Sequence, residues 1–332
     1  MTDVRKNFTT QKGTTKKIPE LKELTPDIIR ETIEGIKKAI RENYVFPEQV
    51  EDFSKALEDH LANGDYDQVM DPKMLCELLT KHLREVVNDK HIQVLLPQDL
   101  PPIGAGQAKK SKEVVGLTRA EILPDNVGYL NITMFNPLYD AAERINGAML
   151  YLKNTNALIV DLRKCRGGHG DTANFLLSYL FDSKFAKILL ETYMRPQNLT
   201  VRNSTTWTPF KYTKPVYVLT SDFTFSGGEH FAYALKIHKK ATIVGTNTGG
   251  GAHPVAIIGL DTGFMFKVPI GRTYDPETGK DWERIGIDPD ISCPSDDALN
   301  EAQKDIRAKL ITEKDGKDRK KVIDGPKKHP NE

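Results

Sequence analysis

The stretch that decides the fold, residues 215–235, reads PVYVLTSDFTFSGGEHFAYAL. Its residues 216–219 form a short apolar run rich in strand-forming side chains, which predicts a buried β-strand. Phe231 and Leu235 then recur at helical spacing, so a helix is expected to begin near Ser226. A serine at such a junction holds its hydroxyl beside free backbone N–H groups, at the positive end of the helix. This position suits a nucleophile that lies next to an oxyanion hole.

Ser226 also has an interpretation that requires no catalysis. Ser226 and Glu229 match the capping box S-x-x-E, which stabilises the start of a helix. Gly227 and Gly228 count against capping as the only role, because each glycine costs roughly 0.8–1 kcal/mol relative to alanine in a helix. Two glycines are useful where another group must approach the backbone closely. The stretch by itself leaves both interpretations open.

The composition is that of an ordinary globular protein without a global charge signal. The 332 residues are 39% hydrophobic and 28% charged, and the net charge is +1. Neither a nucleic acid nor an anionic membrane surface is therefore expected as a partner. No apolar run approaches the roughly 20 residues of a membrane span. The three cysteines are widely spaced and form no CxxC, so neither a disulfide framework nor a metal site is expected, and no cofactor is predicted.

The N-terminal segment, MTDVRKNFTTQKGTTKK, is polar and lacks the apolar core of a signal peptide. The expected location is the cytoplasm if this N-terminus is native. It is the periplasm or the cell exterior if a signal peptide has been removed. The sequence carries no signal for a particular oligomeric state.

The first third of the chain predicts a small helical domain. Residues 1–20 are expected to form a flexible leader, and Thr25-Pro26 is typical of a helix start. Apolar residues at helical spacing predict three amphipathic helices, which begin near residues 26, 50 and 72. We assign residues 21–91 to this domain. A strand and a Pro/Gly/Lys-rich linker follow in residues 92–113.

The rest of the chain alternates strands with helices, which indicates an α/β fold. Parallel strands joined by right-handed crossovers are expected. The α/β domain is assigned to residues 114–312, with Ser295 as the cap of its last helix. Residues 313–332 are rich in charge and are expected to be disordered.

Gly167-Gly168 follows the buried strand ALIVDL of residues 157–162. Such a pair is either a simple turn or a loop that directs backbone N–H groups toward a developing oxyanion. The sequence GGHGD matches neither GxGxxG nor a Walker loop, so a nucleotide site is disfavoured.

His91 and Glu283 each have an ordinary interpretation as well. His91 follows a helix, where a histidine favours the negative end of the helix dipole. Glu283 lies between Trp282 and the Gly286-Ile287 step, where a glutamate is by default a solvated loop residue.

Four motifs together produce a resemblance to a known family. They are DKH ending at His91, DLRKCRGG at 161–168, TFSGGE at 224–229 and WERIGIDPD at 282–290. In this order and spacing they resemble the S41 serine peptidases, which include the C-terminal (tail-specific) processing peptidases, the tricorn core and the interphotoreceptor retinoid-binding proteins. The resemblance covers about residues 25–310 and points to the branch similar to retinoid-binding protein modules and tricorn. It implies a core similar to Clp protease and crotonase, built of ββα units after a helical domain.

The resemblance also implies roles for particular residues. Ser226 matches the nucleophile, His91 the general base and Glu283 the acidic residue that orients the base. The N–H groups of Gly227 and of either Gly167 or Gly168 match the oxyanion hole. The implied reaction is acyl-enzyme hydrolysis of peptide bonds in a peptide or an unfolded protein.

The chain departs from the family pattern in several places. The tail-specific branch uses a lysine base and carries a PDZ domain, whereas residues 241–266 contain no lysine and the linker at 97–113 has no room for such a domain. A serine–lysine mechanism is therefore not expected. Lys90 stands where tricorn has a serine before its histidine, and Cys165 stands where the family motif has an asparagine.

Two other functions are compatible with the resemblance. One is a non-catalytic binding module for an apolar ligand, as in retinoid-binding protein modules. The other is acyl-CoA chemistry of the crotonase type, in which Ser226 and His91 would be superfluous. The complete set of Ser226, His91 and Glu283 favours a serine peptidase, because a pure carrier has no chemical need for it.

Overall fold

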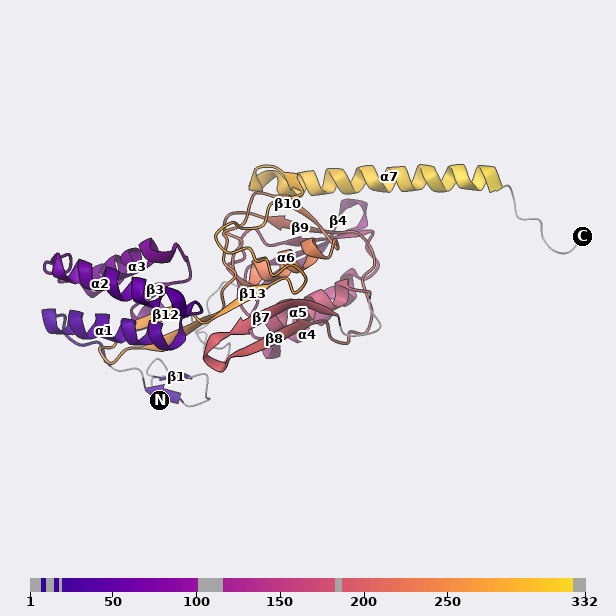
Figure 1. Cartoon of the computed structure of the whole chain (residues 1–332). Helices are drawn as coiled ribbons and strands as arrows, with labels where there is room; N and C mark the ends of the chain where they lie inside the picture. Colours follow the sequence, from indigo (N-terminus) through magenta and orange to yellow (C-terminus); the bar gives the residue numbers. More distant parts are fainter. Residues whose placement is uncertain (1–6, 10–14, 18–19, 101–115, 183–186, 325–332) are drawn as a thin grey trace, which may run out of the picture. The chain divides into compact units, whose positions relative to one another are not determined.

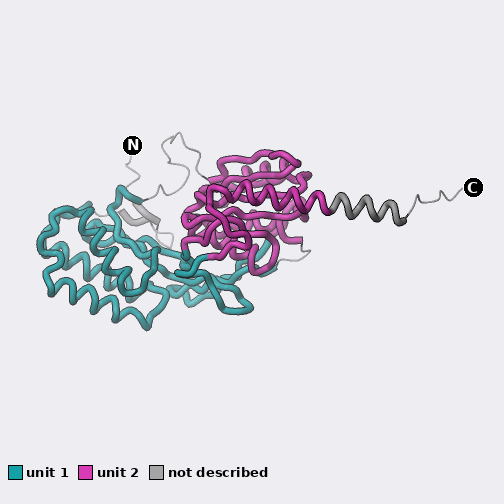
Figure 2. The backbone as a smooth tube through the Cα atoms, turned by 90° about the horizontal axis from the view of Figure 1, so that it is seen from above, with its two compact units in different colours: residues 1–113, 186–205, 250–286 teal, residues 114–185, 206–249, 287–332 magenta. Residues whose placement is uncertain are grey.

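The chain divides into two compact units built from interleaved segments (Figure 2). The structure is a computed structural model that describes residues 7–9, 15–17, 20–100, 116–182 and 187–324, with side chains in 20–100, 116–182 and 187–312. Unit 1 comprises residues 1–113, 186–205 and 250–286, and unit 2 comprises residues 114–185, 206–249 and 287–332. Two segments of unit 1 thus come from within the range 114–312 that the sequence analysis treats as one domain.

Three helices open unit 1, as predicted: α1 (Pro26–Asn43), α2 (Val50–Ala62) and α3 (Pro72–Val87) (Figure 1). The side chain of Thr25 accepts a hydrogen bond from the Ile28 N–H at 3.3 Å, which caps α1. Asp71 caps α3 in the same way, through the Lys73 N–H at 2.9 Å. Asn88 ends α3 in the left-handed conformation, with φ 49°.

Unit 1 also contains two antiparallel three-stranded sheets. The first has the order β11-β12-β3 and the second the order β13-β7-β8. Their strands are β3 (Gln93–Leu95), β7 (Ile188–Met194), β8 (Leu199–Ser204), β11 (Val255–Gly259), β12 (Met265–Pro269) and β13 (Gly271–Tyr274). One apolar core joins the inner faces of the three helices to β3 and β12, with Leu79 and Phe266 fully buried in it. Within the leader, β1 (Asn7–Thr9) pairs with β2 (Thr15–Lys17).

Unit 2 is built on a six-stranded sheet of order β14-β10-β9-β6-β5-β4, which confirms the predicted α/β class. The strands are parallel except for β4, which is antiparallel to β5. They are β4 (Leu117–Leu123), β5 (Val127–Ile132), β6 (Ala157–Asp161), β9 (Val216–Thr220), β10 (Thr242–Gly245) and β14 (Ile291–Ser292). Every residue of β6 and β9 is buried, as expected for central strands of a sheet covered on both faces.

Helices cover the sheet of unit 2. One face packs against α7 (Ala298–Asp324), whose Ala298, Ala302 and Ile306 share an apolar core with the strands. The other helices, α4 (Leu138–Leu152), α5 (Gly170–Leu180) and α6 (Gly227–Ile237), pack side by side in that order. The carboxyl ends of β6 and β9 therefore each lead through a short loop into a helix of this layer.

Helix α7 extends to Asp324, into the segment 313–332 that the sequence analysis assigns to a charged tail. Lysine and arginine, which supply five of the twelve residues from 313 to 324, have high helix propensity. Residues 325–332 and most of the predicted linker at 97–113 lie outside the described residues. Across the described part of the chain, no helix combines the length and the apolar character needed to span a bilayer.

Candidate active site

Ser226 lies at the junction between a strand and a helix, as the sequence predicts. It precedes α6 as the N-cap residue and has φ 51° and ψ −118°. Non-glycine residues seldom adopt a positive φ, and such strained conformations concentrate at functional sites. The Ser226 N–H donates to Glu229 Oε2 at 2.9 Å, and the second oxygen of this buried carboxylate accepts from the Thr248 hydroxyl. The capping arrangement therefore exists, but it holds the serine in an unusual backbone conformation.

The loop that contains Gly167 and Gly168 packs directly against the Ser226 turn. Gly167 has φ 110°, and a Cβ atom on it would lie 2.8 Å from the Ser226 Cβ. Gly168 has φ 116°, and its Cβ would lie 2.1 Å from the Phe135 carbonyl oxygen. A Cβ on Gly227 would in turn lie 2.7 Å from the Gly168 carbonyl oxygen. Glycine is required on both sides of this contact because no side chain fits between the two backbones.

This contact places two backbone donors beside the serine turn. The Gly227 N–H belongs to the first turn of α6, where helix N–H groups have no partner within the helix. Among the described residues, neither the Gly227 N–H nor the Gly168 N–H has a hydrogen-bond acceptor. Backbone N–H groups in such surroundings can stabilise a negatively charged oxygen.

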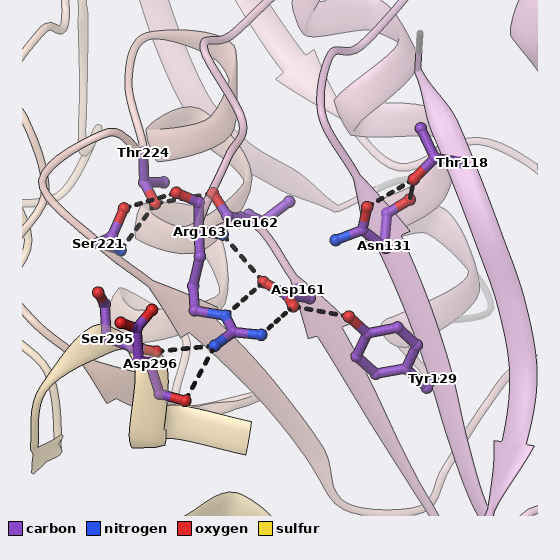
Figure 3. Close-up of polar contacts among 10 residues, drawn as sticks. All are labelled: Thr118, Tyr129, Asn131, Asp161, Leu162, Arg163, Ser221, Thr224, Ser295 and Asp296. Atoms are coloured by element: carbon purple, nitrogen blue, oxygen red, sulfur yellow. Dashed lines mark hydrogen bonds and ion pairs between the residues drawn. The ribbon is translucent and has the colours of Figure 1, made fainter. Parts of the chain in front are cut away.

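The loop after β6 is anchored by an ion pair between Asp161 and Arg163 (Figure 3). Asp161 accepts hydrogen bonds from the Arg163 side chain at 2.7 and 3.0 Å and from the Tyr129 hydroxyl at 2.7 Å. Burial disfavours an ionised Asp161, but these hydrogen bonds hold its pKa below the ordinary value. Arg163 also donates to the Ser295 carbonyl oxygen at 2.8 Å, which connects the loop to the segment that precedes α7.

The same loop is bonded to the segment that precedes Ser226 (Figure 3). The Ser221 hydroxyl donates to the Arg163 carbonyl oxygen at 2.6 Å, and the Thr224 hydroxyl donates to the Leu162 carbonyl oxygen at 2.8 Å. These bonds join the two segments that carry the glycine pairs. These hydrogen bonds therefore fix the position of the 167–168 loop relative to the serine turn.

Cys165 replaces the asparagine of the family motif without entering the site chemistry. Its carbonyl oxygen accepts from the Phe225 N–H at 3.0 Å, which adds a further bond between the two segments. Its thiol is buried, and a Cβ on Gly228 would lie 3.1 Å from its Sγ atom. Burial raises the pKa of this thiol to about 12, so it stays protonated and unreactive at neutral pH.

In unit 1, His91 lies in a buried cluster with Asp89, His253 and Glu283. The Asp89 Oδ1 atom accepts from the His91 backbone N–H at 2.8 Å and lies 3.5 Å from the His91 Nδ1 atom. The Asp89 Oδ2 atom lies 2.7 Å from the His253 Nδ1 atom. Glu283 Oε2 lies 3.5 Å from the same nitrogen. Asp89 therefore contacts both histidines, and His253 contacts both carboxylates.

Two local arrangements hold this cluster. Arg84 on α3 donates to the carbonyl oxygens of Lys90 and Ile92 at 2.7 and 2.8 Å, which fixes the backbone on both sides of His91. Glu283 accepts from the Ala252 N–H at 2.6 Å, and Trp282 donates to the Gly251 carbonyl oxygen at 2.9 Å. The glycine-rich loop that carries His253 is thereby bonded to the turn that carries Glu283.

The environment shifts the pKa of each cluster member. Burial lowers the pKa of His91 below 6.5, and Asp89 opposes this shift only in part. Burial would also lower the pKa of His253, but the hydrogen bond to Asp89 raises it above the ordinary value. Burial raises the pKa of Glu283 to about 7, against the attraction of His253. The pKa of Asp89 is far below its usual range despite burial, because both histidines stabilise its charge.

Asp89, His253 and Glu283 also have the composition of a metal site, with ligand-type atoms within 4.8 Å of one another. The 2.7 Å between Asp89 Oδ2 and His253 Nδ1 is, however, a hydrogen-bond distance. Two ligand atoms at about 2.1 Å from a tetrahedral zinc ion stand roughly 3.4 Å apart. The geometry of this pair fits a shared proton better than a shared metal ion.

A second group, formed by His60, Asp65 and His82, lies among the helices of unit 1. The two imidazole rings are stacked, with centroids 3.5 Å apart and planes at 5°. A histidine lone pair lies in the plane of its ring, so two parallel stacked rings cannot direct both lone pairs at one ion. The Tyr66 hydroxyl is bonded to His82 Nδ1 at 2.8 Å. We therefore interpret this group as a structural polar cluster.

The comparisons with known proteins agree with the motifs. The model of peptidase family S41 matches residues 126–293 of the chain. The chain belongs to peptidase family S41. The N-terminal domain model of this family in eukaryotic IRBP matches residues 13–130, so the two matches together extend over the helical domain and the α/β sheet.

One curated protein and two solved structures illustrate what the chain is similar to. A carboxy-terminal-processing protease of Bartonella bacilliformis is 28% identical over 170 residues, which are 50% of this chain and 38% of that protein. The chain thus spans well under half the length of this relative. The structure of the photosystem II D1 C-terminal processing protease superposes with a TM-score of 0.54 at 17% identity, over 82% of this chain and 94% of the other. A lipoprotein from Streptococcus agalactiae gives a TM-score of 0.62 at 14% identity, over 87% and 99%. At such identities the two structures show a shared fold.

Each residue that the S41 resemblance implies has a defined place. Ser226 and the three glycines come together in unit 2, and His91 and Glu283 come together with Asp89 and His253 in unit 1. The default interpretation of Glu283 as a solvated loop residue is wrong, because only 8% of its side chain is exposed. Sequence reasoning assigned no role to Asp89 or His253. Their signals were the DKH motif and the single histidine in the glycine-rich loop.

Proposed function

We propose that this S41 protein is a serine peptidase that hydrolyses peptide bonds in peptides or unfolded proteins. Ser226 is the nucleophile, His91 the general base and Glu283 the acidic residue that supports the base. The observation that carries the proposal is the strained serine turn packed against the glycine loop, where within the described residues the N–H groups of Gly227 and Gly168 have no acceptor. A helix cap requires neither the positive φ of Ser226 nor the second glycine pair.

The reaction follows from these groups. His91 takes the proton of the Ser226 hydroxyl as Oγ attacks the carbonyl carbon of the substrate, and the carbonyl π electrons move to oxygen. The imidazolium then gives this proton to the leaving amine as the peptide bond breaks, which leaves an acyl-enzyme. A water molecule, deprotonated by His91, attacks the ester and releases the carboxylic acid and the free serine. The low pKa of His91 favours the neutral imidazole that both steps need.

The Gly227 N–H and a N–H of the 167–168 loop would bind the oxyanion. We predict that Gly227→Ala lowers kcat by about 10²–10³-fold with little change in KM, because the new methyl group displaces the Gly168 carbonyl and breaks up the donor pair. Steady-state kinetics on a peptide substrate measures this. Gly147→Ala on α4 is the matched control, since nothing lies within 4 Å of a Cβ there. Wild-type kcat in Gly227→Ala would contradict the assignment of the oxyanion hole.

A fluorophosphonate probe tests the proposed function directly, because it reacts with activated serines. We expect one equivalent of label on the wild-type protein, located at Ser226 by peptide mass analysis, and no label on Ser226→Ala. Absence of labelling and of peptide hydrolysis in the folded wild-type protein would overturn the proposal. A folded but inert protein of this kind would favour the non-catalytic binding module.

A further inference from the structure

The buried cluster of unit 1 has a definite order of contacts. Asp89 is fully buried and divides its two oxygens between two histidines, with Oδ1 toward His91 and Oδ2 toward His253. Glu283 approaches His253 at 3.5 Å. Among the described residues, no hydrogen bond or ion pair joins Glu283 to His91. The order is therefore Glu283, His253, Asp89, His91.

This order differs from the arrangement that the resemblance implies, in which Glu283 orients the base itself. We infer that Asp89 is the carboxylate that orients His91, and that Glu283 acts on this base only through His253. The inference rests on the proposed function, since it concerns the base of the same reaction. Asp89 and His253 are positioning residues in it, because neither touches the substrate.

The division of the Asp89 carboxylate supports the inference. Its Oδ1 atom also accepts the His91 backbone N–H at 2.8 Å, and this bond holds the carboxylate at an ion-pair distance of 3.5 Å from the His91 Nδ1 atom. A carboxylate in this position favours the His91 tautomer with a proton on Nδ1, in which Nε2 is unprotonated and can act as a base. It also stabilises the imidazolium that forms when His91 takes a proton.

The charges around the two histidines assign them different roles. His253 faces Asp89, Glu283 and Asp281, and its pKa is raised. His91 faces Asp89, but also Lys267 and His253, and its pKa is lowered. The Asp89–His253 contact therefore favours the charged forms of both groups, whereas burial favours the neutral form of His91. In its ionised form Glu283 favours the protonated state of His253, and through His253 it affects the charge that Asp89 presents to His91.

A kinetic double-mutant cycle tests this order of contacts. The variants are Asp89→Asn, His253→Gln, Glu283→Gln and the double variant His253→Gln/Glu283→Gln. We expect Asp89→Asn to lower kcat by about 10³–10⁴-fold with KM nearly unchanged, as when the carboxylate of a triad is neutralised. We expect Glu283→Gln to lower kcat by roughly 10–100-fold in the wild-type background and by less than about threefold in the His253→Gln background. The matched controls are His82→Gln and Asp275→Asn, which replace buried residues of unit 1 outside the cluster.

Two outcomes would overturn the inference. One is wild-type kcat in Asp89→Asn. The other is a Glu283→Gln effect of the same size with and without His253, which would show that Glu283 acts on the base directly. Because fluorophosphonate labelling of the wild-type protein is measured first, a protein that carries no label disproves the proposed function, whereas an active protein with an additive cycle disproves only this order of contacts.

NMR titration of the wild-type imidazoles gives a test that does not depend on the folding of any variant. We expect His253 to remain protonated to a higher pH than His91 does. We also expect a strongly deshielded Nδ1 proton on His253, as in a hydrogen bond to a carboxylate. The opposite order of titration would contradict the charge assignment.

Discussion

Ser226→Ala is expected to abolish peptide hydrolysis and leave the fold intact. Removal of the nucleophile lowers kcat by about 10⁶-fold in a well-studied serine peptidase, and we expect a loss of at least about 10⁴-fold here. The stability should fall by no more than about 1 kcal/mol, because the variant loses only the side-chain half of the capping box and keeps the bond from its backbone N–H to Glu229. Peptide hydrolysis and thermal unfolding on the same preparation measure both effects.

Ser54→Ala is the matched control for this variant. Ser54 lies on α2, where it is buried, and its hydroxyl donates to the Val50 carbonyl oxygen. The control should keep full activity. If Ser226 were a helix cap alone, its replacement would have the same cost of about 1 kcal/mol of stability but would spare the activity. Full hydrolysis by Ser226→Ala would therefore remove it from the mechanism.

His91→Ala is expected to lower kcat by a comparable factor, about 10⁴-fold or more, because the serine hydroxyl loses its proton acceptor. The wild-type rate should rise with pH through a pKa below 6.5 and then level off. The direction follows from burial, which disfavours the imidazolium form of His91, and only the neutral form accepts a proton. A pH profile of kcat measures this rise on the acidic side.

The control for His91 is His82→Gln, whose imidazole is bonded to Tyr66 rather than to the cluster. Its pH profile should match that of the wild-type protein. A rate that climbs only above about pH 9 would be typical of a lysine base. Such a profile, together with an unimpaired His91→Ala, would refute the assignment of the base.

Most of the fold could be predicted because the decisive patterns are local. Isoleucines at helical spacing identify α1, and the apolar runs ALIVDL and VYVL identify β6 and β9. The interleaved composition of unit 1 could not be predicted in the same way. One of the two partners of β12 is β3, more than 160 residues earlier, and nothing in either segment specifies the other.

The candidate site likewise has features that could be predicted from the sequence and features that could not. The serine turn and the glycine pairs were predictable, because a steric requirement for glycine is visible in the sequence. Glu283 was first interpreted as solvated, since no local pattern shows that a loop will be buried. Asp89 was overlooked because its role depends on His253, a contact between residues 164 positions apart. Contacts of this kind arise from the tertiary fold alone.

The interleaving of the two units has a consequence for synthesis. A chain emerges from the ribosome from its N-terminus, and domains generally fold as units during this process. The first sheet of unit 1 needs β12, and the sheet of unit 2 gains its last strand with β14. Neither unit can therefore be complete until most of the polypeptide has left the ribosome. Until then the apolar faces of α1, α2 and α3 lack the completed sheet on which they pack, so they stay exposed for longer than those of a domain built from one continuous segment would.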